Sequence, residues 1–406
     1  MSSTPGLPFR SIVLPAIVPT LLFAIGEGAI LPIIPLLAND LGATLALAGL
    51  VAAMITLGTL VGDIPSGWVV ARVGERRAMT GAALLCLVGL GIGVAAPAPA
   101  VLGIGVFLIG LSTAVFALAR HAYMTTTVPR EYRARALSLL GGTFRLGFFI
   151  GPFLSAAVIH LTGDTRSALW VHVVACLATA AVLLLTPDPT VRVQHSTTGE
   201  EFVQEEARGL FRTLRDRRAV LARLGLGAAL VGASRASRQV ILPLWAVSIG
   251  MADAQAALII GIAGAVDFAL FYAGGQVMDR FGRLWTAVPS LIGLAIGHAV
   301  LAGTHDLAAA SAWFVVAAIV MALANGIGSG ILMTIGADLA DQRNPAPFLG
   351  AWRFTGDVGA ASAPLLIAAV TGVASLAAAA GAVGVLSLIG AGVMLRYIPR
   401  YAPHRR

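Results

Sequence analysis

The chain has 406 residues, of which 58% are hydrophobic and 11% are charged, and its mean hydropathy is +0.90. Charged residues are too scarce to cover the surface of a soluble protein, which excludes a water-soluble globular fold and indicates an integral membrane protein. The net charge of +8 comes from arginines dispersed among short loops, so nucleic-acid binding is not expected.

Twelve apolar runs are each long enough to cross about 30 Å of hydrocarbon as a helix. They begin near Ser11, Thr44, Ala78, Ala100, Ala136, Ala168, Ala219, Asp253, Leu284, Leu307, Pro347 and Ser375. The runs are uninterrupted, unlike the short alternating strands of an outer-membrane barrel. The first run extends to Leu37, which is too long for a signal-peptide core, and no small-residue cleavage site follows it. We therefore expect an all-α membrane protein that keeps its first span.

One long polar stretch divides the chain into two halves. We predict an N-terminal six-helix bundle at residues 1–187, a cytoplasmic linker at 188–218 and a C-terminal six-helix bundle with a short tail at 219–406. The linker is either a solvated tether or an amphipathic helix on the membrane surface. Arginines are concentrated in alternate loops, which places both termini in the cytoplasm. The absence of lysine and the abundance of alanine and glycine point to the cytoplasmic (inner) membrane of a bacterium.

Unusual residues of the two halves coincide at an offset of 208 residues. The coinciding pairs are Gly67 with Gly275, Arg72 with Arg280, Gly74 with Gly282, Pro35 with Pro243, Arg145 with Arg353 and Gly151 with Gly359. A period near half the chain indicates one bundle used twice rather than a solenoid. Two such bundles in a membrane predict a substrate site near the midplane between them.

One loop motif follows both the second and the eighth predicted span. Its residues are Gly67, Ala71, Arg72 and Gly74 in the first copy, and Gly275, Asp279, Arg280, Gly282 and Arg283 in the second. Both copies resemble the G-x-x-x-D-R-x-G-R loop of the major facilitator superfamily, and the resemblance covers nearly the whole chain. It implies twelve transmembrane helices in two pseudo-symmetric six-helix bundles. Ala71 stands where the family usually has Asp, which puts the charge contact of the first copy in doubt.

Two further motifs combine glycine and proline inside predicted spans. Gly26, Pro32 and Pro35 resemble a motif of drug-exporting members of the superfamily, and Gly147, Gly151 and Pro152 resemble a motif of its antiporters. Proline kinks a membrane helix and glycine lets helices approach, so both motifs suit a gating element. The resemblance implies the drug:proton antiporter branch, whose members carry out multidrug efflux.

Eight charged side chains are predicted inside the membrane, where each needs a partner or a wet cavity. They are the acids Glu27, Asp63, Asp267 and Asp357 and the bases Arg145, Arg235, Arg238 and Arg353. Their depths, together with the helix packing that the resemblance implies, predict two cross-bundle pairs, Asp63 with Arg353 and Arg145 with Asp267. These pairs would close the cytoplasmic side and break as it opens. Arg353 could instead pair with Asp357 one helical turn away.

Glu27 is the leading candidate for proton coupling, followed by Asp63 and Asp267. Glu27 and Arg235 occupy equivalent positions in the two halves, and the resemblance implies that their helices face each other across the cavity. Glu27 could instead be a structural partner of Arg235 or of nearby backbone groups. The predicted cavity residues are Glu27, Arg235, Arg238, Phe144, Tyr272 and Asn325.

Cys86 and Cys176 each lie in an apolar span, as do His172 and His298, and neither a disulfide framework nor a histidine proton relay is expected from them. Each is expected to serve in packing or in a structural hydrogen bond, so neither a metal nor another cofactor is predicted. Walker and G-x-S-x-G motifs are also absent from the sequence, and we do not expect an enzyme.

These features predict a secondary active transporter that exports small organic molecules, either drugs or metabolites, in exchange for protons by alternating access. Its expected partners are a small-molecule substrate, protons and the lipid bilayer, and a monomer is expected. An alternative is uptake or facilitated diffusion of a nutrient or metabolite. A non-transporting membrane receptor or a lipid-handling protein on the same fold is a further alternative.

Overall fold

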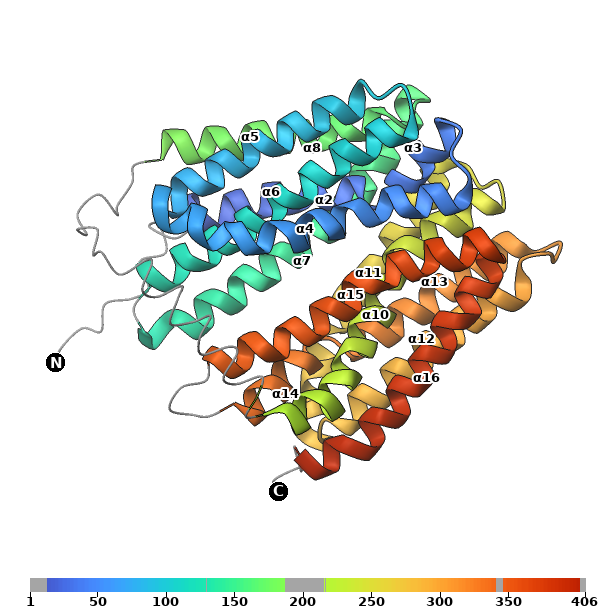
Figure 1. Ribbon diagram of the computed structural model, residues 1–406. Helices are drawn as coiled ribbons and strands as arrows, with labels where there is room; N and C mark the ends of the chain where they lie inside the picture. The colour runs from blue at the N-terminus through green and yellow to red at the C-terminus, as the bar shows by residue number, and fades with distance from the viewer. Residues whose placement is uncertain (1–12, 129, 187–214, 216, 341–345, 402–406) are drawn as a thin grey trace.

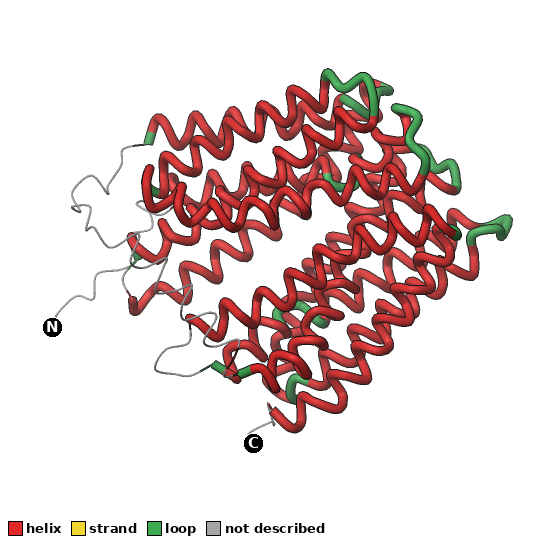
Figure 2. The backbone as a smooth tube through the Cα atoms, viewed as in Figure 1, coloured by secondary structure: helices red, strands yellow, loops and turns green. Residues whose placement is uncertain are grey.

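The computed structural model describes residues 13–128, 130–186, 215, 217–340 and 346–401. Every regular element in these ranges is helical (Figure 2). Eleven of the described helices are long and apolar enough to cross a membrane, and one bent pair of shorter helices raises the number of spans to twelve. This confirms the expected all-α membrane architecture.

The helices form two bundles (Figure 1). The first contains η1 (Val13–Ile17), α2 (Val18–Ile30), α3 (Ile34–Asp40), α4 (Leu45–Val73), α5 (Glu75–Val94), α6 (Pro99–Thr127), α7 (Arg130–Thr162) and α8 (Ser167–Leu185). The second contains α10 (Arg218–Ser248), α11 (Asp253–Phe281), α12 (Leu284–Thr304), α13 (Ala310–Ile327), α14 (Ile331–Leu339), α15 (Ala346–Val373) and α16 (Leu376–Tyr401). Most of the predicted linker lies outside the described residues.

Most predicted spans begin within a few residues of the observed helices, and α7 differs most. It begins at Arg130, whereas the apolar run begins near Ala136. Its first turns carry Arg and Glu, which are good helix formers and extend the helix beyond the apolar segment. The bent span consists of α2 and α3, which meet at 41° across a short turn that contains Pro32.

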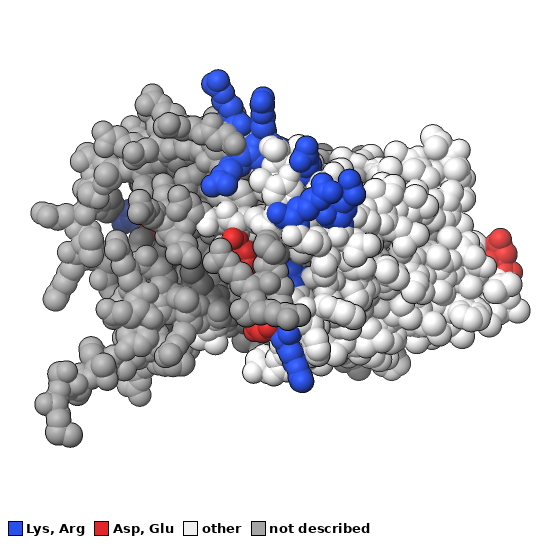
Figure 3. All heavy atoms as spheres, turned by 90° about the horizontal axis from the view of Figure 1, so that it is seen from below, with Lys and Arg blue, Asp and Glu red and all other residues white. Residues whose placement is uncertain are grey.

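Both termini lie at the same end of the molecule in Figure 1, which we call the termini end, and the opposite end is the far end. In the view of Figure 3, arginine side chains gather towards the termini end, and most of the remaining described surface is uncharged. This distribution agrees with the predicted orientation, in which short cytoplasmic loops carry the positive charge.

Small residues let the two bundles approach closely at the far end. A side chain on Gly49 of α4 would meet Leu244 of α10 and Ala368 of α15. On another part of the interface, a side chain on Gly261 of α11 would meet Pro152 of α7. Glycine and alanine at such positions allow helix backbones to come together.

Towards the termini end, α4 and α15 no longer cover each other. Asp63 of α4 is exposed, and the side chain of Arg353 of α15 is 77% exposed. Tyr272 of α11 is 74% exposed. The described residues therefore show a conformation that is closed at the far end and open at the termini end.

The duplicated loop motif forms the same turn twice. Gly74 joins α4 to α5 with a φ of 84°, and Gly282 ends α11 with a φ of 96°. Only glycine adopts this backbone region without strain. In the second copy, Arg283 forms an ion pair with Asp338 of α14, with Nε and Oδ2 separated by 2.7 Å. The shared turn supports the duplication that the 208-residue offset predicts.

Candidate functional site

Helix α10 separates its serines from its arginines. Ser234 and Ser237 are fully buried inside the C-terminal bundle, whereas Arg235 and Arg238 are partly exposed. Positions 235 and 238 are three residues apart and therefore lie on one face of the helix. Arg235 comes within electrostatic range of Arg145 on α7, so this face is directed towards the N-terminal bundle.

Asp267 of α11 is the acceptor at the centre of a hydrogen-bonded network. Its Oδ2 atom accepts from Arg238 Nη2 and from Asn325 Nδ2, each at 2.7 Å. The Oδ1 atom of Asn325 accepts from Arg235 Nε at 2.8 Å. The amide of Asn325, on α13, thus links Arg235 to Asp267, which in turn holds Arg238, and the network fixes both guanidinium groups.

Arg145 brings a third guanidinium from the N-terminal bundle. It donates to the Ser329 hydroxyl and lies over the ring of Phe271, with 4.0 Å between the guanidinium carbon and the ring centroid. Both partners belong to the C-terminal bundle. Because Arg145 also lies within electrostatic range of Asp267, three arginines surround one carboxylate at this place.

Glu27 of α2 lies in the N-terminal bundle with only 6% of its surface exposed. Its Oε1 atom accepts from the Thr113 hydroxyl at 3.5 Å, which is at the limit of a hydrogen bond. Its Oε2 atom is buried with no hydrogen-bond partner among the described residues. Among the charged and titratable groups, His172 and Arg120 have the strongest electrostatic interactions with the Glu27 carboxyl. Glu27 is thus a buried carboxyl with spare hydrogen-bonding capacity.

The glycines beside Glu27 explain its position. A side chain at Gly26 would overlap His172 of α8, and one at Gly28 would lie 2.8 Å from the Phe148 Cα atom of α7. On the opposing helix, Gly147 and Gly151 have no room for side chains against α2. The two glycine motifs predicted from sequence therefore meet in one close helix crossing.

Arg120 of α6 lies near the same carboxyl. Its guanidinium carbon is 4.4 Å from the ring centroid of Phe144, a predicted cavity residue. A cation over an aromatic face is stabilised by the ring quadrupole. Phe144 therefore helps to hold a positive charge within range of Glu27.

None of the expected cross-bundle ion pairs is formed among the described residues in this conformation. Arg353 pairs with Asp357, with Nε and Oδ2 separated by 3.4 Å, and Asp63 comes only within electrostatic range of them. The Asp63–Arg353 pair is expected only when this end is closed, and here α4 and α15 have separated at the termini end, so the pairing stays a prediction. The alternative pair within α15 is the one observed.

The other two expected contacts also have different partners. Arg145 crosses to the C-terminal bundle as expected, but it bonds Ser329, whereas Asp267 pairs with Arg238. Arg235 bonds Asn325 and forms no ion pair with Glu27 among the described residues, so the reading of Glu27 as a structural partner of Arg235 gains no support in this conformation. Tyr272 makes no hydrogen bond or ring contact with the network in the described residues.

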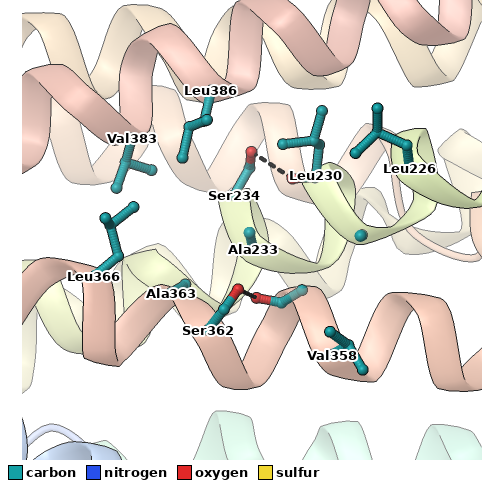
Figure 4. Close-up of a pocket in the computed structure, with 12 residues that line it drawn as sticks. Leu226, Leu230, Ala233, Ser234, Val358, Ser362, Ala363, Leu366, Val383 and Leu386 are labelled. Carbon is teal, nitrogen blue, oxygen red and sulfur yellow. Dashed lines mark hydrogen bonds between the residues drawn. The ribbon is translucent and has the colours of Figure 1, made fainter.

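A cavity of about 220 Å³ lies between α10, α15 and α16, away from this network (Figure 4). Its lining is almost wholly apolar. The labelled serines turn inward to their own helices, since Ser234 donates to the Leu230 carbonyl and Ser362 to the Gly359 carbonyl. No predicted site charge lines the cavity, so we do not assign it as the solute site.

The comparison with family models decides the classification. The model described as Major Facilitator Superfamily matches residues 18–346, and a second match covers residues 224–406. The chain belongs to the major facilitator superfamily. The second match falls on the C-terminal half, in agreement with the internal duplication.

Among curated proteins, this major facilitator protein is similar to sugar symporters. It is 24% identical to the galactose-proton symporter of Escherichia coli (strain K12) over 168 residues, or 41% of this chain and 36% of the symporter. It is 26% identical to the arabinose-proton symporter of the same strain over 170 residues, or 42% of this chain and 35% of the symporter. These matches therefore span little more than a third of each relative.

Solved structures of this superfamily share the fold over the whole chain. A peptide transporter POT in complex with sulfate has a TM-score of 0.76 at 15% identity, and the match covers 98% of this chain and 96% of that one. A D-xylose-proton symporter has a TM-score of 0.72 at 17% identity, with 98% and 100% covered. The protein is therefore a transporter of the major facilitator type, and the expected drug:proton antiporter branch is not confirmed by these relatives.

Sequence reasoning missed several neutral residues that contact Arg145 or Glu27. Ser329 and Phe271 hold Arg145, and Thr113 contacts Glu27. Neutral side chains of this kind give no signal in a search for charges. The glycines at 326, 328 and 330 were a usable sequence signal for Ser329, because a membrane helix interrupted by glycine often marks a binding site, and the structure has a break between α13 and α14 here.

Proposed function

We propose that this protein is a proton-coupled transporter that takes up small organic anions. The observation that carries the proposal is the placement of Arg145, Arg235 and Arg238 around the single carboxylate of Asp267. An uncompensated charge inside a membrane costs about 2.5 to 3.5 kcal/mol on insertion scales. A solute that carries a carboxylate or phosphate would offset the excess positive charge.

Arg235 is the best placed of the three to contact the solute. Only its Nε atom makes a hydrogen bond among the described residues, and Asn325 fixes that side of the guanidinium. The terminal nitrogens remain available for bidentate binding of a carboxylate or phosphate. Arg145 would add a contact from the other bundle, so the solute would touch both bundles at once.

Glu27 is the proposed proton carrier. A carboxyl that is buried, has a spare oxygen and lies near Arg120 can alternate between a protonated and an ionised form as its access to water changes. Asp267 also has a buried oxygen without a partner, Oδ1, but its Oδ2 atom forms an ion pair with Arg238 and accepts from Asn325, which favours a permanently ionised carboxylate. Asp63 is exposed in the present conformation and would exchange protons there without coupling.

Uptake is supported by the galactose-proton and arabinose-proton symporters among the relatives. Export in exchange for protons is the second candidate, and the close crossing of α2 and α7 at Gly147 and Gly151 favours it, since that motif resembles one of antiporters. Right-side-out and everted vesicles separate the two. Symport predicts accumulation of the solute inside right-side-out vesicles under an inward proton gradient, with the acid outside. Export in exchange for protons predicts accumulation inside everted vesicles under an outward proton gradient, with the acid inside.

A ligand panel tests the charge of the solute. Purified full-length protein would be heated with monocarboxylates, dicarboxylates, sugar phosphates, neutral sugars and organic cations, and ligand binding would raise the unfolding temperature. We expect stabilisation by one of the anion classes, with the shift lost in Arg235→Gln and kept in the control Arg400→Gln, an exposed arginine at the end of α16. Stabilisation by neutral sugars or cations that is equal in wild type and Arg235→Gln would refute the anion proposal.

A further inference from the structure

Three potential metal ligands meet inside the N-terminal bundle, away from the arginine network. Cys86 of α5 and His172 and Cys176 of α8 are each fully buried. Their ligand atoms all lie within 4.8 Å of one another, and the Cys86 Sγ and His172 Nε2 atoms are 3.5 Å apart. Among the described residues this is the one group of three His, Cys, Asp or Glu side chains close enough to hold a single ion.

The distance between Cys86 Sγ and His172 Nε2 matches that of two ligands on one ion. Two ligands on one zinc ion, with Zn–S and Zn–N bonds of standard length and a tetrahedral angle, lie about 3.6 Å apart. His172 and Cys176 are one helical turn apart on α8, so both point to the same side of that helix.

The C-terminal bundle provides an internal comparison. At the 208-residue offset, Cys86, His172 and Cys176 correspond to Leu294, Ala380 and Gly384. That bundle also buries a histidine between the equivalent helices, but both ring nitrogens of His298 have partners. Nε2 lies 2.9 Å from the Ser237 hydroxyl and Nδ1 lies 2.8 Å from the Leu294 carbonyl.

His172 is not satisfied in this way. Its Nδ1 atom is buried with no hydrogen-bond partner among the described residues. A buried polar atom without a partner is unfavourable, so packing alone does not account for this ring. Glu27 has a similar unpartnered oxygen and lies within electrostatic range of His172 and Cys86. A carboxylate beside a metal-bound histidine commonly accepts the proton of the second ring nitrogen.

We propose that Cys86, His172 and Cys176 form a binding site for a thiophilic metal ion, with Zn²⁺ as the best match. Two thiolates and one imidazole are soft to borderline ligands, which Zn²⁺ and Cu⁺ prefer over Mg²⁺ or Ca²⁺. Zn²⁺ with two thiolates and a neutral imidazole is formally uncharged, which suits an apolar bundle. Binding releases the two thiol protons, and no electron transfer is involved.

Metal content tests the proposal directly. Tag-free full-length protein in detergent, kept reduced, would be equilibrated with Zn²⁺, freed of excess ion and analysed for zinc per chain. Co²⁺ would replace Zn²⁺ in a parallel sample, because thiolate ligation gives a charge-transfer absorption that surface binding by carboxylates lacks. We expect about one ion per chain and a thiolate band in wild type.

Matched variants decide whether the bound ion occupies this cluster. The double variant Cys86→Ser with Cys176→Ser should lose the ion and the band, and His172→Gln should bind at least tenfold more weakly. His298→Gln removes the comparable buried histidine of the other bundle and should retain both signals. Wild type that binds no more Zn²⁺ or Co²⁺ than the double variant would overturn the proposal. A Cys86–Cys176 disulfide in protein isolated without reductant, together with no metal uptake after reduction, would overturn it as well.

Discussion

The α2–α7 crossing provides a controlled test of the packing, because α7 carries one glycine at the contact and another outside it. A Cβ atom at Gly151 would lie 2.5 Å from the Ile25 carbonyl oxygen and 2.5 Å from the Gly28 carbonyl carbon. Ordinary contacts of this kind are about 3.5 to 4.0 Å, so the helices would have to separate by about 1 Å. A Cβ atom at Gly141, on the same helix, would meet nothing within 4 Å.

The two substitutions by alanine gain the same helix propensity, but only one of them overpacks the helix crossing. Replacing glycine with alanine inside a helix contributes up to about 1 kcal/mol through backbone propensity, and this gain is common to both variants. Overpacking typically costs about 1 to 3 kcal/mol, and only Gly151→Ala incurs it. We therefore expect Gly141→Ala to be neutral or stabilising, and Gly151→Ala to be less stable than Gly141→Ala by about 1 to 3 kcal/mol.

The free energy of unfolding can be measured for both variants by SDS titration in mixed micelles. The side chain added in Gly151→Ala would press on the segment of α2 that contains Glu27. This variant should therefore also slow transport more than Gly141→Ala does. Equal unfolding free energies, within about 0.5 kcal/mol, would show that α2 and α7 do not approach as closely as described.

Three further predictions concern the charges. Glu27→Gln should abolish gradient-driven accumulation of the solute in vesicles while retaining exchange, and concentrative transport by the variant would remove Glu27 from the proton pathway. Asp63→Arg combined with Arg353→Asp should recover more transport than either single change, because the pair is expected to form when the termini end closes; no recovery would refute the pairing. Asp267→Asn should destabilise the protein by about 2 kcal/mol, since two bonds to a charged acceptor become neutral ones. Adding Arg238→Gln should restore part of that stability, and strictly additive losses in the two single variants would show that the ion pair contributes nothing.

The span count and the duplication could be predicted because both depend on local patterns. An apolar run of sufficient length must be helical in a bilayer, since every backbone group needs an internal partner. The turns at Gly74 and Gly282 follow from short motifs that recur at a fixed offset. Hydropathy does not predict where a helix ends when it extends beyond the apolar run, as the first turns of α7 show.

Side-chain partners could be predicted only in part. Arg235, Arg238 and Asn325 were expected in one cavity, and the structure places them in one hydrogen-bonded network with Asp267. Depth along a helix does not distinguish Ser329 from Asp267 as the partner of Arg145, because the choice depends on how the facing helices orient their side chains.

The cysteine and histidine cluster illustrates a different limit. Cys86 and His172 lie on helices that are distant in sequence. The sequence alone therefore predicts that each packs separately in an apolar span. The sequence already showed that His172 and Cys176 are four residues apart, which places them on one face of a helix. The third ligand could be found only from the packing of α5 against α8.

The small residues between the bundles at the far end also bear on the energy of the transport cycle. Surfaces built from glycine and alanine, as at Gly49 and Ala368, interlock little, and parting them uncovers little apolar area. Neither access state would then hold a large energetic advantage over the other. Reversing a 1:99 population of two states takes about 5.5 kcal/mol of differential binding, an amount that one proton and one small solute can supply together. A smooth interface of this kind would let weak ligands drive a large movement in either direction.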